Sequence, residues 1–301
     1  MISICIPIYN NYTYPLVDSL ARQAANFDKD EYEIVCIDDH SSEHYLAQNE
    51  GISKIANYIK LDENVGRARI RNMFLKYAKG EYLLFLDCDS LVPEKYLQGY
   101  ADTLISEPTV VVGGRVYDET FNDREHRLSY LYGIRMESRP LKARIKAPYR
   151  SFMTNNFMVR RDVLECIRFD ENITKYGHED TIFGYRLEQN HIPILHIENA
   201  VINGVVEENA EFLRKSVEAV ENLAEIYKNM HEDPNFCQSV KLLKAYERVK
   251  SMGMTWLVYN MFKTFKKQME HRFVKGKINL KQFSFYKLGV FIETFDKKQK
   301  P

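Results

Sequence analysis

The sequence predicts an α/β protein with a mostly parallel, mixed sheet flanked by helices, followed by a helical C-terminal appendage. Two observations lead to this class. Over about the first 200 residues, short apolar runs alternate with stretches of helical spacing, which is the rhythm of βαβ units. Beyond Glu207 the alternation stops, and apolar residues recur at helical spacing. We therefore expect an α/β domain over residues 1–205 and a mainly helical, basic region over residues 206–301.

The expected elements follow the chain in order. Apolar runs predict strands over residues 2–8, 33–37, 58–61, 82–86, 110–116 and 200–204. Helical spacing predicts helices over residues 14–26, 66–78, 93–105 and 181–189. In the C-terminal region, one helix is expected to start at an Asn209 cap, and a second carries the apolar residues between Met254 and Phe265.

Composition bounds the class of protein. With 45% hydrophobic residues among 301, the chain can bury a sizeable core. No apolar run approaches the roughly 18 residues of a spanning helix, and the first residues enter a strand without a basic leader, so export is not expected. The five cysteines are spread along the chain without a Cys-x-x-Cys pair, which indicates neither a disulfide framework nor a zinc site. The cytoplasm is the expected location.

The formal net charge of zero hides an asymmetry. Residues 241–301 hold 15 Lys and Arg against 4 Asp and Glu, a net of +11, so the rest of the chain is at −11. This basic region is expected to meet an anionic partner, a membrane surface or an acidic glycan rather than nucleic acid, or to be a solvated helical face. The apolar residues between Met254 and Phe265 either pack on the α/β domain or attach peripherally to the inner face of a membrane.

Two carboxylates, Asp87 and Asp89, directly follow the apolar run of residues 82–86, so they are expected at the mouth of a buried strand. Carboxylate oxygens suit Mg²⁺ or Mn²⁺, hard cations that are often shared with the phosphates of a nucleotide. The alternative is that both aspartates only cap the segment that follows. Tyr9 and the pair Asp38-Asp39 also follow strands, and ligands of open sheets bind beyond such carboxyl ends.

Glycine loops that bind phosphates are missing, because the sequence contains neither G-x-G-x-x-G nor G-x-x-x-x-G-K-[ST]. A Rossmann dehydrogenase or a P-loop enzyme is therefore not expected. Arg67 and Arg71, four residues apart on a predicted helix, are candidates to offset the charge of a diphosphate. The alternative is a plain surface helix.

Five segments, in this order, resemble the motifs of the family 2 glycosyltransferases, which have the GT-A fold. They are residues 3–10 (SICIPIYN), 37–41 (IDDHS), 64–72 (NVGRARIRN), 80–89 (GEYLLFLDCD) and 177–180 (GHED). The resemblance covers about the first 205 residues. It implies an inverting, metal-dependent transfer of a hexose or N-acetylhexosamine from a UDP-sugar, less so a GDP-sugar. The implied acceptor is a hydroxyl of a glycan or lipid-linked saccharide in cell-surface polysaccharide synthesis.

The resemblance also implies roles for single residues. Pro7, Tyr9 and Asp39 border the nucleobase, Asp87 lies near the ribose, Asp89 binds the Mn²⁺ or Mg²⁺ ion, and Asp180 is the catalytic base. Chemistry favours UDP, because the carboxylate of Asp39 can accept a hydrogen bond from the imide N–H of uracil. The open alternatives are that Pro7 ends a strand, that Tyr9 packs in the core and that Asp38 serves a turn.

The sugar and metal contacts complete the expected site. The sugar or acceptor contacts are expected among Asn155, Asn156 and Glu179, with Arg115 as a further candidate, and His178 is open. Asn203 stands where many relatives of this family carry a histidine that reaches the metal, and its amide oxygen is the expected ligand there. Because an amide is uncharged, either the metal is bound more weakly or another group, such as His196, contributes.

Two other functions stay open. A catalytically idle glycan-binding protein on the same fold is favoured by Asn203. A nucleotidyltransferase would hold two metals on Asp38-Asp39 and Asp87 to Asp89, but it would need a basic phosphate loop, and residues 7–13 contain no Lys or Arg.

Overall fold

The computed structural model describes residues 1–28, 30–231 and 233–297. The chain divides into two compact units. An α/β unit comprises Met1–Asp118, Glu137–Thr174 and Glu179–Val205, and a helical unit comprises Glu119–Met136, Lys175–His178 and the chain from Val206 onward. The two units are described separately.

The α/β unit is built on a large sheet with the strand order β3-β2-β1-β4-β8-β6-β9. Its strands are β1 (Ile2–Ile8), β2 (Tyr32–Asp38), β3 (Asn57–Lys60), β4 (Tyr82–Leu86), β6 (Val110–Val112), β8 (Asn156–Arg160) and β9 (Ile194–His196). Strands β1 to β4 pair in parallel, as do β6 and β9, whereas β8 runs antiparallel to both β4 and β6. The predicted fold class, a mostly parallel mixed sheet, is confirmed.

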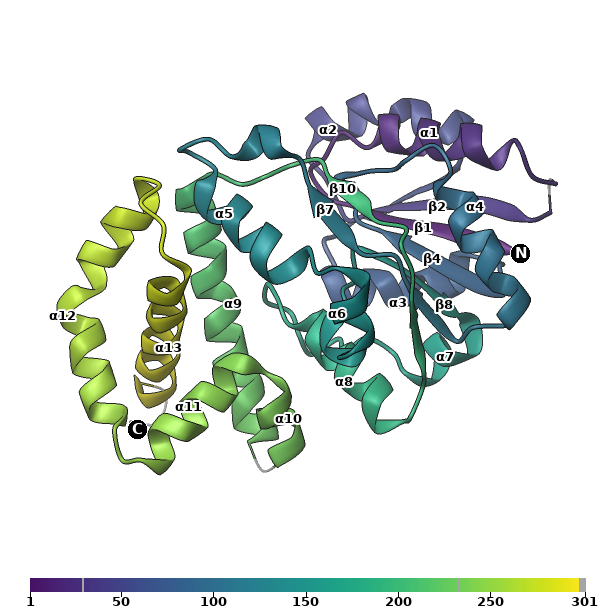
Figure 1. Cartoon of the computed structure of the whole chain (residues 1–301). Helices are drawn as coiled ribbons and strands as arrows, with labels where there is room; N and C mark the ends of the chain where they lie inside the picture. Colours follow the sequence, from purple (N-terminus) through teal and green to yellow (C-terminus); the bar gives the residue numbers. More distant parts are fainter. Residues whose placement is uncertain (29, 232, 298–301) are drawn as a thin grey trace. The chain divides into compact units, whose positions relative to one another are not determined.

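Helices cover both faces of this sheet (Figure 1). They are α1 (Tyr14–Ala24), α2 (Glu43–Gln48), α3 (Arg67–Tyr77), α4 (Tyr96–Ala101), α6 (Leu141–Ile145), α7 (Arg161–Cys166) and α8 (Glu179–Gln189). Strand residues alternate between two apolar clusters: Ile4 and Ile6 join α1 and α4 on one face, and Cys5 joins α3, α7 and α8 on the other. Burial on both faces explains why these strands read as continuous apolar runs.

A second, small sheet lies beside the end of β4. It has the order β5-β10-β7, formed by β5 (Ser90–Leu91), β10 (Val201–Asn203) and β7 (Arg115–Tyr117). The expected single strand over residues 110–116 is therefore wrong, because it breaks into β6 and β7. Gly113 and Gly114 make the break: Gly114 has a φ of +92°, and a Cβ on Gly113 would lie 2.4 Å from the Asn199 carbonyl oxygen.

The helical unit contains α5 (Arg127–Tyr132), α9 (Asn209–Met230), α10 (Pro234–Ser239), α11 (Lys241–Ser251), α12 (Thr255–Val274) and α13 (Leu280–Lys297). Its core is aromatic, with Phe262, Phe273 and Phe283 fully buried. None of the helices in the described ranges combines the length and apolar character that crossing a membrane requires.

Asn209 does not cap α9 as expected. It is the first helical residue, its Oδ1 accepts a hydrogen bond from the Leu128 N–H at 2.7 Å, and its Nδ2 donates to the Arg124 carbonyl at 2.8 Å. The side chain thus ties a neighbouring loop and the start of α5 to α9.

Candidate active site

The loops that follow β1 and β2 are locked together at one edge of the large sheet. The Asn10 N–H donates to Ser41 Oγ at 2.9 Å, and the Ser42 N–H donates to Asn10 Oδ1 at 2.9 Å. Asn10 and His40 have φ values of 46° and 62°, in the left-handed region that non-glycine residues seldom adopt. Because β2, β1 and β4 are parallel neighbours, residues that follow all three meet at this edge.

The two aspartates after β2 have different environments. Asp38 accepts hydrogen bonds from the Ser41 N–H at 2.7 Å and the Tyr58 hydroxyl at 3.1 Å, so it stabilises the turn after β2. These contacts give no support to the two-metal site that a nucleotidyltransferase would need at Asp38. Asp39 accepts from the backbone N–H groups of Val65 at 2.6 Å and Gly66 at 3.0 Å, and burial raises its pKa. Each of its oxygens keeps a second lone pair for a ligand.

The other residues expected at the nucleobase stand at the same edge. Tyr9 is 54% exposed, which excludes the core alternative for its ring. Pro7 lies inside β1, opposite Ile37 of β2, so it does not end the strand.

Buried Arg71 of α3 joins two carboxylates that are far apart in the sequence. Its Nη2 lies 3.0 Å from Asp87 Oδ1, and its Nη1 lies 3.8 Å from Glu179 Oε1. Arg67 approaches the same Glu179 oxygen at 3.5 Å from a more exposed position. The side chain of Arg71 is only 3% exposed, which excludes the surface-helix alternative for this arginine.

A second arginine extends this arrangement on the far side of Asp87. Arg115 Nη2 lies 3.9 Å from Asp87 Oδ2, and its Nη1 lies 3.2 Å from Glu137 Oε2, which also accepts a hydrogen bond from the Tyr117 hydroxyl. The result is a chain of alternating charges, which we call the ionic chain. It runs in the order Glu179, Arg71, Asp87, Arg115, Glu137.

Sequence reasoning missed two of these neighbours, Glu137 and Tyr117. Glu137 is the last residue of a π-helical turn, Gly133–Glu137, and no motif surrounds it. Its ion pair with Arg115 joins residues that are 22 positions apart, and it forms because the small sheet positions Arg115. The sequence therefore contains no local signal for Glu137. The π-helical turn, which is frequent at functional sites, is visible only in the structure.

Five buried side-chain atoms of the described residues lack a hydrogen-bond partner, and all belong to this region. They are Arg71 Nε, Asp89 Oδ1, Ser90 Oγ, Arg115 Nε and Asn155 Nδ2. Buried polar atoms are normally paired, so this concentration indicates a ligand site. Burial, and then the charge of Asp87, raises the pKa of Asp89. An unpartnered carboxylate oxygen beside a second carboxylate fits a divalent cation.

The two candidates for a further metal ligand differ. Asn203 lies opposite Ser90 in the small sheet, and the neighbouring Gly204 N–H donates to the Asp89 carbonyl at 2.9 Å. The His196 alternative is wrong: its Nδ1 lies 3.3 Å from Arg144 Nη1, its Nε2 lies 3.0 Å from the Pro148 carbonyl, and burial lowers its pKa to about 4. The described residues contain no cluster of three or more Asp, Glu, His or Cys suited to a metal.

The two adjacent asparagines expected at the sugar, Asn155 and Asn156, have different environments. The prediction for Asn156 is wrong, because all four hydrogen-bonding positions of its amide are used. It accepts from the hydroxyls of Tyr96 and Tyr100 and donates to the carbonyls of Gly114 and Asn199. Asn155 is 3% exposed and has an unpartnered Nδ2, while its carbonyl accepts from the Asp87 N–H at 3.2 Å.

Asp180 lies in the first turn of α8, next to Glu179. Its Oδ1 accepts a hydrogen bond from the Thr181 N–H at 2.6 Å. Burial, followed by the charge of Glu179, raises the pKa of Asp180 to about 7. A carboxyl with such a pKa can exchange a proton at neutral pH.

Comparisons with known proteins identify the family and the fold of this chain. The model of the family described as Glycosyl transferase family 2 matches residues 3–168. Poly(ribitol-phosphate) beta-glucosyltransferase of Bacillus spizizenii is 34% identical over 119 residues, which cover 37% of this chain and 18% of that protein. The chain spans between 18% and 60% of the length of the first three curated relatives that it matches.

Two solved structures have a similar fold. The mannosyltransferase PcManGT from Pyrobaculum calidifontis in complex with GDP-Man and Mn²⁺ has a TM-score of 0.58 at 14% identity, covering 99% of this chain and 88% of that one. Staphylococcus aureus TarS 1–349 in complex with UDP-GlcNAc has a TM-score of 0.51 at 19% identity, covering 99% and 92%. The strand order and the family match lead to one conclusion: the chain belongs to glycosyl transferase family 2 and has the GT-A fold.

Proposed function

We propose that this chain transfers a sugar from a UDP-sugar to a hydroxyl of a glycan or lipid-linked saccharide, with inversion, during synthesis of a cell-surface polysaccharide. The observation that carries the proposal is the ionic chain, in which Arg71 joins Asp87 after β4 to Glu179 in α8. It links the segment expected to bind the donor to the segment that holds Asp180. Family membership supports the type of reaction.

In the proposed reaction, Asp180 accepts the proton of the acceptor hydroxyl. The hydroxyl oxygen forms a bond to the anomeric carbon from the face opposite the diphosphate, and the bond to the diphosphate oxygen breaks, which inverts the centre. The electron pair of that bond leaves with the diphosphate. A carboxyl with a pKa of about 7 is well matched to such a transfer at neutral pH.

Negative charge on the donor needs a counter-charge, and this chain offers two sources. Arg67, half exposed beside Glu179, can turn toward the diphosphate, while Arg71 and Arg115 each keep an unpartnered Nε. Asp89, with the amide oxygen of Asn203, would hold Mn²⁺ or Mg²⁺. When bound, such an ion would neutralise charge on the departing diphosphate.

The donor is proposed to be a UDP-hexose or UDP-N-acetylhexosamine. Asp39 supports uracil over cytosine for the reason given above, and the exposed ring of Tyr9 can stack on the base. A relative at 34% identity over 107 residues, poly(ribitol-phosphate) beta-N-acetylglucosaminyltransferase TarS of S. aureus, supports a hexosaminyl donor and a polymer acceptor. The cytoplasm, where nucleotide sugars are made, is the proposed location.

The first test is the nucleotide. We would titrate the purified chain with UDP, GDP, CDP and dTDP by calorimetry, in Mn²⁺ and in EDTA. We expect binding of UDP that depends on the metal and exceeds that of the other nucleotides. Binding of none of the four would contradict the transferase proposal.

Asn203 favours a second candidate, an idle glycan-binding protein, because an uncharged amide replaces the imidazole that many relatives place near the metal. This candidate predicts glycan binding that is unchanged in Asp180→Asn and no release of UDP by the unaltered chain from any UDP-sugar. Release of UDP that requires both acceptor and Asp180 would exclude it.

A further inference from the structure

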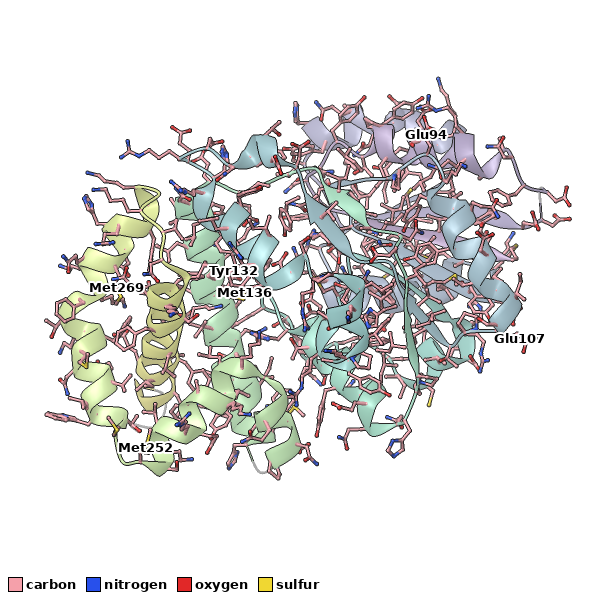
Figure 2. All side chains as sticks on the ribbon, in the orientation of Figure 1. Glu94, Glu107, Tyr132, Met136, Met252 and Met269 are labelled. Carbon is pink, nitrogen blue, oxygen red and sulfur yellow. The ribbon has the colours of Figure 1, made fainter. Side chains whose placement is uncertain are left out.

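A small cavity adjoins Arg115 of the ionic chain. It has a volume of about 230 Å³, and its polar lining consists of Arg115, Ser138, Arg139, Arg144 and Glu198, all in the α/β unit. Ser138 and Arg139 follow shortly after Met136, which Figure 2 labels. Sites for drug-sized ligands usually occupy about 300 to 1,000 Å³. This cavity, which we call the Arg139 cavity, therefore suits a single small group rather than a second nucleotide.

Arg144 brings a buried positive charge to the Arg139 cavity. The residue is 4% exposed, and all three of its guanidinium nitrogens donate to backbone carbonyls, over distances between 2.8 Å and 3.1 Å. It forms no ion pair with any carboxylate among the described residues. Burial lowers its pKa, but a guanidinium stays protonated in proteins. Its contacts therefore hold the cation in place without neutralising it.

Arg139 supplies the hydrogen-bond donors that the anchored arginine lacks. Within the described part of the chain, two of its five N–H groups are used: Nη1 donates to Ser151 Oγ at 2.6 Å, and Nη2 donates to the Ala143 carbonyl at 3.3 Å. The hydroxyl of Ser138, in the same lining, can donate as well. The cavity thus has available donors next to a fixed cation.

The charges around the Arg139 cavity do not balance. Arg115 is already engaged by the carboxylates of the ionic chain. Glu198, the carboxylate in the lining, is exposed and forms no ion pair with a residue that the structure describes. Arg139 and Arg144 against Glu198 leave one positive charge in excess. This excess favours an anionic ligand.

We propose that the Arg139 cavity binds a phosphate group and, resting on the proposed function, that this phosphate is part of the acceptor. Two guanidinium groups, one before α6 and one within it, suit a tetrahedral group whose oxygens point in several directions, whereas a single guanidinium fork satisfies a planar carboxylate. The donor diphosphate has other counter-charges, Arg67 and the metal on Asp89. Arg115 forms a wall of the cavity and lies 3.9 Å from Asp87, so an acceptor phosphate held there would stand beside the donor.

Three probes of similar size separate the possible ligand chemistries. We would titrate the full chain by calorimetry with glycerol 1-phosphate, glycerate and glycerol, in EDTA so that no bound metal can hold the phosphate. We expect saturable binding of glycerol 1-phosphate that weakens as salt increases, weaker binding of glycerate and no binding of glycerol. Binding of glycerol 1-phosphate should persist at saturating UDP with Mn²⁺, because the donor occupies a different site.

Variants of opposite sign, with a matched control, test the assignment of the cavity. Arg139→Gln should weaken binding of glycerol 1-phosphate about tenfold, because it removes charge-assisted hydrogen bonds. Glu198→Gln should strengthen it about two- to threefold, because it removes the negative charge of the lining. Arg168→Gln changes the net charge as Arg139→Gln does, but at an exposed arginine of the α/β unit outside the cavity, and should have no effect.

The remaining outcomes are also decisive once circular dichroism shows that the variants are folded. Undetectable binding of glycerol 1-phosphate, or equal weakening by Arg139→Gln and Arg168→Gln, would overturn the phosphate site. Displacement of glycerol 1-phosphate by UDP would assign the arginines to the donor diphosphate and overturn the acceptor role. If the chain binds UDP but not glycerol 1-phosphate, this inference fails alone. If it binds glycerol 1-phosphate through Arg139 but no nucleotide, the phosphate site stands and the proposed function fails.

Discussion

The titration of Asp180 sets the pH range in which the proposed reaction can run. The base must be a carboxylate, and burial beside Glu179 raises its pKa from 3.8 to about 7. We therefore expect kcat/KM to rise with pH and to level off above an apparent pKa near 7. Asp180→Asn should lower kcat by about 10² to 10⁴-fold while leaving UDP binding nearly intact. A profile that is flat between pH 5 and pH 8 would contradict the role of Asp180.

The raised pKa of Asp180 also means that its ionised form destabilises the folded state at neutral pH. Between the unfolded pKa of 3.8 and the folded value of about 7, the folded chain binds more protons than the unfolded one, so stability falls as pH rises through this window. We expect Asp180→Asn to raise Tm at pH 8 and to change it little at pH 4. Asp162→Asn is a control of opposite sign, because a hydrogen bond from Arg160 lowers the pKa of Asp162. A lower Tm for Asp180→Asn at pH 8 would contradict a carboxylate whose pKa is raised in the folded state.

Neighbouring asparagines show what the sequence could not decide. Asn155 and Asn156 look alike in the motif, but Asn156 is the first residue of β8 and faces Tyr96 and Tyr100, while Asn155 precedes the strand and has an unpartnered amide. The choice depends on contacts with α4, about 60 residues away, which local patterns do not report.

These asparagines give a paired prediction. Asn156→Ala should lower the free energy of unfolding by about 3 kcal/mol, because it leaves two buried hydroxyls and two carbonyls without their partner. Asn155→Ala should leave stability almost unchanged, since its Nδ2 has no partner to lose, and should lower kcat/KM. Urea denaturation and initial rates measure both effects, and the reverse assignment of the two effects would refute the sugar contact at Asn155.

At the scale of elements, α3 contributes through the geometry of Arg71. Its two terminal nitrogens reach Asp87 and Glu179, and one also donates to the Arg67 carbonyl, which a lysine with a single ammonium cannot reproduce. We expect Arg71→Lys to lower the free energy of unfolding by about 3 kcal/mol and to reduce kcat/KM strongly. Arg69→Lys, exposed two residues away on the same helix, should change stability by less than about 0.5 kcal/mol. Equal effects of the two variants would show that the ionic chain has no special role.

Elements were predictable where one local signal dominates. The strands predicted over residues 2–8 and 82–86 have the same bounds as β1 and β4. Both strands are buried on their two faces, so each is an almost continuous apolar run whose limits are visible in the sequence. The break between β6 and β7 was missed, because residues 110–116 read as β-branched apart from two glycines and Arg115. Gly113 is required by groups far away in the sequence, among them the Asn199 carbonyl 86 residues later, and Gly114 by its φ of +92°.

For the whole molecule, the order of motifs along the chain predicted the fold, since polar residues after successive parallel strands must meet at one edge of the sheet. This logic placed Tyr9, Asp39 and Asp87 at one edge from the sequence alone, whereas it did not predict that Arg71 would join Asp87 to Glu179. It could not reach Glu137 and Tyr117, which join through a π-helical turn and a small sheet with no sequence signature. The residues that directly follow the strand ends were therefore predictable. The residues that join the site through contacts between distant parts of the sequence were not.

Ligand-linked stability of the whole chain tests the metal and the nucleotide together. Mass action predicts that UDP with Mn²⁺ stabilises the folded state by about 2.7 kcal/mol at a concentration near 100 Kd, and EDTA should remove most of this gain. Asp89→Asn should abolish the metal-dependent part. Without ligand it should raise Tm above pH 7, because it removes a buried charge whose pKa is raised by burial and by Asp87. An equal thermal shift in EDTA, or in Asp89→Asn, would mean that UDP binds without a metal on Asp89 and that the arginines alone offset the charge of the diphosphate.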